Sequence, residues 1–196
     1  GWLAGFLFLA LLLWREKETT WHAVSAAAAL LLGLTGIGLM FAYLFTDDAH
    51  WIFASIKFGT FGLLLPVYFT VCHRMLPFFA GTALPGYTVF RPMAALALFW
   101  LLAMAHLGLE LSHAYAWLWL ADLPLAAMTG WLLWRWWPHG RAMPALLNVL
   151  MLGFAWLPIA ALLYSVQSLW LLMDGGFTLG RAPAHALFIG FFGSLL

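Results

Sequence analysis

Four adjacent side chains near the middle of the chain could do chemistry. Cys72, His73, Arg74 and Met75 bring together a thiol, an imidazole, a guanidinium and a thioether. Imidazole is the commonest protein ligand for metals and a usual axial ligand of haem, and sulfur ligands suit Cu(I). Arg74 could neutralise a haem propionate or another anion. A structural interpretation is equally open: His73 caps a helix, Cys72 packs as a small apolar side chain, and Arg74 anchors the membrane interface.

A second polar group lies where an apolar run is interrupted. His106, Glu110 and His113 are spaced i, i+4 and i+7, which places them on one face of a helix. The two histidines would lie about 10 Å apart along the axis, too far to share one ion on an ideal helix. They could serve two centres, or they could converge if the helix breaks at Ser112.

Further ionisable residues lie within or beside apolar runs. His185 has small neighbours that leave room for a flat macrocycle, and His50 follows a pair of aspartates. We include both as candidate metal ligands. Lys57 and Asp122 lie inside expected spans, where an isolated charge is costly. We hypothesise that they pair with each other, with Glu110 or with a haem propionate.

The composition determines which class of protein can hold these residues. The chain has 196 residues, of which 66% are hydrophobic and 8% are charged, and its mean hydropathy is +0.99. A soluble domain carries roughly 25% charged residues. Membrane-spanning β-strands would alternate in polarity, whereas these apolar runs are long and continuous. The sequence therefore predicts an all-α, polytopic transmembrane bundle in contact with the lipid bilayer and without a nucleic-acid partner.

The apolar runs predict about seven spans, five whole and two truncated. Both ends of the chain fall inside apolar runs, so we expect residues 1–196 to be a single transmembrane helical domain, a fragment of a longer protein. The motif around His73 is expected at the end of the third span, followed by a non-helical connection over residues 74–91, which contains several Pro and Gly residues. The expected spans are residues 2–14, 21–45, 51–72, 92–109, 115–134, 144–173 and from 182 onward.

Charged residues predict the orientation of these spans. Most of the basic residues fall on one side of the membrane, which the positive-inside rule assigns to the cytoplasm. The motif around His73 lies on that side, and the turn from Glu110 to His113 lies on the other. The basic residues on the cytoplasmic side are Arg15, Lys17, Arg74, Arg91, Arg135 and Arg141.

The stretch from Cys72 to Phe79, with the sequence CHRMLPFF, resembles the HRM-x-PFF signature of the NnrS family. The similarity extends from about residue 50 to the end of the chain. Other stretches that resemble the family are residues 65–70, 122–126, 153–157 and 180–187, together with Tyr87, Arg91, Pro92 and Gly190.

The resemblance implies both a fold and a function. NnrS-like proteins are polytopic proteins of the bacterial inner membrane with about twelve helices. They are associated with haem b, with copper and with resistance to nitric oxide and nitrosative stress, often in denitrification. The resemblance implies a metal centre that binds nitric oxide or a related small ligand, and it leaves open whether the ligand is converted or only bound.

The candidate ligands follow from both lines of reasoning. We expect haem or copper to be bound first by His73 and His185, because they lie in the stretches that best match the family. His106 comes next, then His50 and His113, with Cys72 and Met75 as sulfur ligands and Arg74 beside the cofactor.

Two other functions remain open from the sequence. One is a b-type haem electron-transfer subunit with a quinol or respiratory partner. The other is a cofactor-free transporter whose polar path includes Lys57, Glu110 and Asp122.

Overall fold

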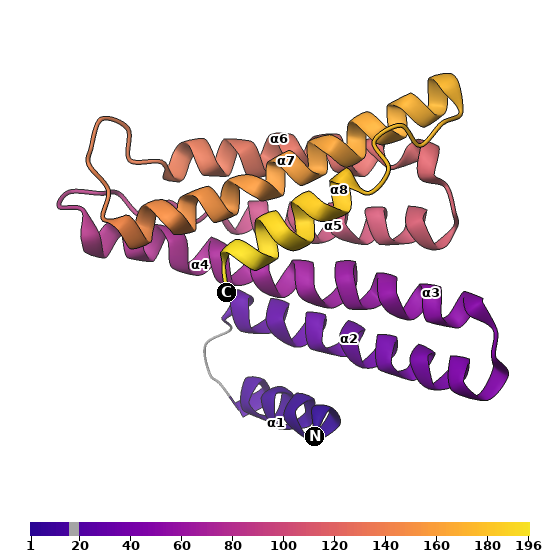
Figure 1. Ribbon diagram of the computed structural model, residues 1–196. Coiled ribbons are helices and arrows are strands. Elements are labelled where there is room, and N and C mark those ends of the chain that lie inside the picture. Colours follow the sequence, from indigo (N-terminus) through magenta and orange to yellow (C-terminus); the bar gives the residue numbers. More distant parts are fainter. Residues whose placement is uncertain (16–19) are drawn as a thin grey trace. The chain divides into compact units, whose positions relative to one another are not determined.

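The computed structural model of the protein describes residues 1–15 and 20–196. Over these residues the chain is all-helical and contains no strand, as the sequence predicts (Figure 1). Seven helical segments are present in this part of the chain. Four segments are single helices: α1 (Trp2–Arg15), α2 (Trp21–Thr46), α5 (Met93–Leu111) and α7 (Ala145–Asp174). The third segment joins α3 (Ala49–Lys57), η1 (Phe58–Leu64) and α4 (Leu65–Ala83) into one continuous helix. The fifth segment consists of η2 (Tyr115–Trp117) and α6 (Trp119–Trp136), and the seventh consists of α8 (Ala182–His185) and η3 (Ala186–Phe192).

Five of these segments are long and apolar enough to cross a membrane. They cover residues 21–46, 49–83, 93–111, 115–136 and 145–174. The first and last segments are shorter, as expected. A chain with these segments is a multi-pass membrane protein. Lys17 and the link around it lie outside the described residues.

The chain forms two compact units, Gly1–Val71 and Cys72–Leu196, and the boundary between them falls within α4. In the first unit, α2 packs along α3 and η1, and α1 packs on α2. Small residues on α2 allow this close approach: a Cβ atom on Gly33 would lie 2.9 Å from Leu63 Cδ2. The Ser55 hydroxyl donates to the Gly36 carbonyl at 2.8 Å and ties α2 to α3.

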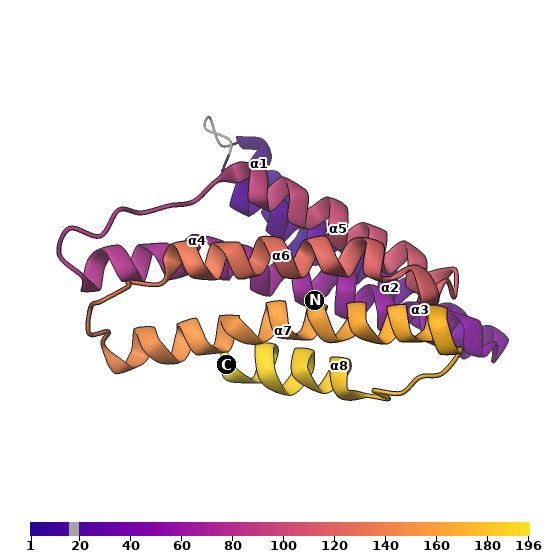
Figure 2. The same cartoon turned by 90° about the horizontal axis from the view of Figure 1, so that it is seen from above.

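In the second unit, α6 and α7 lie side by side over much of their length (Figures 1 and 2). The opposite flanks of this pair are covered by α5, which packs on α6, and by η3, which packs on α7. The tightest approach is at Gly190, where a Cβ atom would lie 2.6 Å from the Trp156 ring. Side chains that are fully buried at the centre include Phe99, Leu132, Trp136, Met151, Phe154 and Phe191.

The structure corrects the predicted end of the third span. The helix does not end at Cys72: α4 continues through Pro77 to Ala83, so only residues 84–92 form the connection. Pro77 lacks the N–H that would bond to the carbonyl of the fourth residue before it, but helices of membrane proteins tolerate such a loss when neighbouring groups replace the bond. The motif from Cys72 to Met75 therefore lies inside a helix.

The predicted break near Glu110 is confirmed with a small shift. Helix α5 ends at Leu111, and His113 adopts a left-handed backbone with φ of 55°. The Ala114 N–H then bonds back to the Leu109 carbonyl at 2.8 Å. This tight reversal directs the chain into α6, so that the end of α5 and the start of α6 lie at the same end of the second unit.

Candidate functional site

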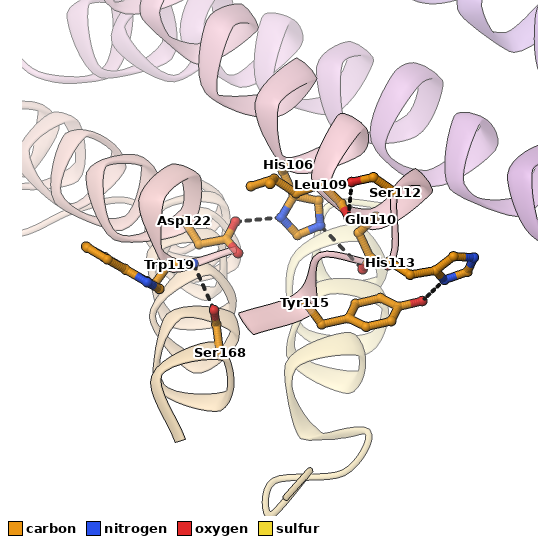
Figure 3. A network of polar contacts seen from close by, with 9 residues as sticks. All are labelled: His106, Leu109, Glu110, Ser112, His113, Tyr115, Trp119, Asp122 and Ser168. Atoms are coloured by element: carbon orange, nitrogen blue, oxygen red, sulfur yellow. Dashed lines mark hydrogen bonds and ion pairs between the residues drawn. The ribbon is translucent and has the colours of Figure 1, made fainter. Parts of the chain in front are cut away.

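A buried imidazole–carboxylate pair connects α5 and α6. His106 Nδ1 lies 2.7 Å from Asp122 Oδ1, and the two residues are 2% and 1% exposed (Figure 3). When Asp122 is ionised its carboxylate can only accept, so His106 Nδ1–H then donates this hydrogen bond. When the ring is neutral, Nε2 is then its basic nitrogen.

A second carboxylate faces that other nitrogen. Glu110 lies one turn further along α5, and its Oε1 is 3.6 Å from His106 Nε2. Glu110 is only 3% exposed. The Tyr164 ring, from α7, meets the imidazole edge-on with centroids 5.2 Å apart. Three helices thus enclose one imidazole between two acids and an aromatic ring.

The surroundings of this pair contain polar atoms that could hold a further group. Asp122 Oδ2 and Trp119 Nε1 are buried, and neither forms a hydrogen bond with any residue that the structure describes. The Trp119 backbone N–H donates to Ser168 Oγ at 3.1 Å, which ties the start of α6 to α7 (Figure 3). Burying polar atoms without partners is costly, so a water molecule or a bound group would stabilise this site.

His113 does not join the cluster. The reversal after Leu111 turns it away from the face of His106, and it is exposed. Its Nδ1 atom lies 2.8 Å from the Tyr115 hydroxyl (Figure 3). The structure therefore keeps the predicted neighbours His106 and Glu110 and adds Asp122. Sequence reasoning missed the pairing of His106 with Asp122, whose one signal was an acid inside an apolar span.

The stretch from Cys72 to Met75 has a different environment. His73 is fully buried, and its Nε2–H donates to the Pro92 carbonyl at 3.2 Å. Its ring also meets the Trp136 ring edge-on at 5.9 Å. Cys72 is buried, Met75 is half-buried and Arg74 is exposed. His73 thus fastens α4 to the residue that precedes α5.

Hydrogen bonds to backbone carbonyls hold the loops at this same end. Trp136 Nε1 donates to the Phe90 carbonyl at 2.8 Å, and the Tyr87 hydroxyl donates to the Trp136 carbonyl at 2.9 Å. Burial raises the pKa of Tyr87 above its ordinary value, although the nearby Arg135 charge opposes this shift. Tyr87 therefore remains a donor at neutral pH. Arg141 also donates, to the Pro85 carbonyl at 2.9 Å.

The remaining predicted residues lie apart from these clusters. His185 is exposed at the last position of α8, and His50 is exposed in the first turn of α3. Lys57 Nζ lies over the rings of Phe53 and Phe61, at 5.3 and 5.8 Å from their centroids. Within the second unit, the partner of Asp122 is His106.

Two cofactors can be tested against these positions. Among residues 1–15 and 20–196, no three or more His, Cys, Asp or Glu side chains are grouped to hold a metal ion. A haem iron can be held by a single imidazole. His106 fits that role chemically, because a metal-bound histidine usually donates its other ring N–H to a carboxylate.

A family model described as NnrS protein matches residues 1–196, the whole chain. No curated protein and no solved structure matches it significantly.

Proposed function

This chain belongs to the NnrS family of membrane proteins related to the nitric oxide response, and on that premise we propose that it binds nitric oxide at a haem held in part by His106. The proposed location is the inner membrane of a bacterium. The observation that supports the proposal best is the buried pair of His106 and Asp122, joined at 2.7 Å within the membrane-spanning helices.

Asp122 prepares the imidazole for this role. It accepts the Nδ1 proton of His106, which fixes the tautomer and the ring orientation and makes Nε2 more basic. A bound haem would supply the iron to which nitric oxide binds. The protein contributes the ligand nitrogen and the helices that bury it.

Glu110 limits how a ligand can approach. Its Oε1 lies 3.6 Å from His106 Nε2, so the carboxyl must turn aside before that nitrogen can bind a metal. A neutral, protonated Glu110 would reduce the cost of burying two carboxylates together.

The other predicted ligands are part of the proposal. His73 would have to release the Pro92 carbonyl to bind a metal through Nε2. His185 is exposed, so its ring is accessible. Among the described residues no three His, Cys, Asp or Glu side chains are grouped to hold a metal ion, and we derive no step that involves copper. The family match lends no support to a quinol partner.

Haem content and the absorption change on adding nitric oxide test the proposal. We expect the purified protein to carry haem and His106→Ala to lose it. Asp122→Asn should retain haem with roughly 10- to 100-fold weaker binding, because the orienting carboxylate is gone. His139→Ala is the matched control, since this exposed histidine bonds to the Trp134 carbonyl.

Two outcomes would contradict the proposal. If His106→Ala keeps the full haem content, the assignment of His106 is wrong, and if His73→Ala and His185→Ala also keep it, those two assignments are wrong as well. A folded wild-type protein without haem would favour the cofactor-free transporter instead.

A further inference from the structure

The acidic residues of the second unit lie at one of its ends, and four of its five arginines lie at the other. From Cys72 to Leu196 the acidic residues are Glu110, Asp122 and Asp174, which lie at the end of α5, the start of α6 and the end of α7. Because α5, α6 and α7 alternate in direction, these three positions lie at one end of the bundle (Figures 1 and 2). The opposite end contains no acidic residue of this unit. Four exposed arginines belong to it: Arg74, Arg91, Arg135 and Arg141.

This arginine end, defined by those four residues, is held in place by the fold. The loop of residues 84–92 is fastened to the end of α6 by Trp136 and Tyr87. Arg141 reaches across to the Pro85 carbonyl at 2.9 Å, so the loop after α6 is tied to the loop before α5. The guanidinium of Arg135 lies 4.6 Å above the Phe90 ring. These contacts tie together the backbone that carries Arg91, Arg135 and Arg141, which lowers the entropy cost of binding a ligand there.

The position of this surface matches the boundary of the membrane. Arg74 follows His73, which bonds to Pro92 directly before α5. Arg74 and Arg91 therefore lie near the level at which α5 begins to cross. The exposed rings of Trp131 and Trp134 lie on the last turns of α6 beside Arg135. Trp and Arg together are typical of the headgroup layer.

From these observations we infer that the arginine end binds the phosphate of an anionic membrane lipid. Guanidinium groups bind phosphate through paired hydrogen bonds. No carboxylate of this unit lies near these guanidinium groups, so no acidic side chain of the unit competes with a phosphate for them. A lipid with a net negative headgroup, such as phosphatidylglycerol, satisfies this surface better than the zwitterionic phosphatidylcholine. The inference does not depend on haem.

Thermal unfolding of the complete chain in neutral detergent, followed by intrinsic tryptophan fluorescence, tests this inference as lipid is added. We expect phosphatidylglycerol to raise the unfolding temperature more than phosphatidylcholine, and inorganic phosphate to have little effect. Arg91→Gln combined with Arg135→Gln should weaken apparent phosphatidylglycerol binding by roughly fivefold for each arginine removed. Arg181→Gln, an exposed arginine at the acidic end, should leave it unchanged.

The double Arg→Lys variant at positions 91 and 135 keeps the positive charges that the double Gln variant removes. It should therefore keep most of the preference for phosphatidylglycerol, which shows that the loss in the Gln variant is due to charge and not to misfolding. If the double Gln variant does not fold, the wild-type protein still gives a test, because salt should weaken binding to an exposed charged surface. Equal stabilisation by both lipids would overturn the inference. So would an unchanged preference in the double Gln variant, or an equal effect of free phosphate.

Discussion

Each end of the second unit buries a histidine, and the two histidines differ in the groups that they contact. These contacts, rather than the extent of burial, decide what each histidine can do. His73 and His106 are both almost completely inaccessible. His73 donates to the backbone carbonyl of Pro92, a neutral group whose charge never changes. His106 lies between Asp122 and Glu110, which can both change their charge. The first arrangement suits a structural tie, and the second suits a ligand or a proton carrier.

The same contrast extends to the surroundings of each histidine. Around His73, the side chains of Trp136, Tyr87 and Arg141 bind backbone carbonyls and fix loops. Around His106, side chains bind one another, and the buried atoms Asp122 Oδ2 and Trp119 Nε1 make no hydrogen bond within the described part of the chain. The end around His73 therefore stabilises the fold, whereas the end around His106 has polar atoms that can bind a further group.

The largest expected effect tests the ionisable end. Asp122→Ala should destabilise the protein by about 3–5 kcal/mol, because it leaves His106 Nδ1 buried without its hydrogen-bond partner. Unfolding by a denaturing detergent measures the change. Asp174→Ala removes an exposed acid at the same end and should change stability by less than ~0.5 kcal/mol. Similar values for the two variants would contradict the view that the buried cluster is tightly coupled.

A smaller effect tests the structural end. Trp136→Phe removes the donor to the Phe90 carbonyl and should cost roughly 1–3 kcal/mol. Hydrogen exchange of residues 84–92 should accelerate, because this loop loses its attachment to α6. Trp134→Phe, which alters an exposed ring on the same helix, serves as the control. Unchanged exchange in the Trp136 variant would show that the loop is held by other contacts.

The smallest effect concerns Tyr87. Tyr87→Phe should cost about 0.5–1.5 kcal/mol near neutral pH, because its hydrogen bond to the Trp136 carbonyl is lost. The folded protein raises the pKa of Tyr87, so its contribution is complete below the ordinary tyrosine pKa and is lost as pH rises through the raised value. The stability difference between wild type and variant, measured from pH 8 upward, should therefore shrink at high pH. A constant difference would argue against this linkage.

Much of the fold could be predicted from the sequence because the length and polarity of each run are local properties. The seven segments follow the predicted spans within a few residues, except at the end of the third. There, Pro and Gly residues favoured a loop, but α4 continues past Pro77 to Ala83. A proline removes one hydrogen bond, and packing decides whether the helix tolerates that loss.

The candidate site was only half predictable for a similar reason. The spacing of His106 and Glu110 on one helix follows from 3.6 residues per turn. Asp122 is 16 residues from His106, and their contact depends on a reversal whose exact position the sequence did not give. His113 is seven residues from His106 but lies beyond the end of α5. A helical pattern could not show which of its members would leave the helix.

The sequence by itself determined that this chain crosses a membrane, where its spans lie and which loops are basic. These properties depend on the transfer of local apolar segments into lipid and on charges close to them in the chain. Only the tertiary structure decided which group each buried histidine meets. His73 and His106 look alike as single residues, but the packing of α4 against the loop before α5, and of α5 against α6, gives one a carbonyl and the other two acids.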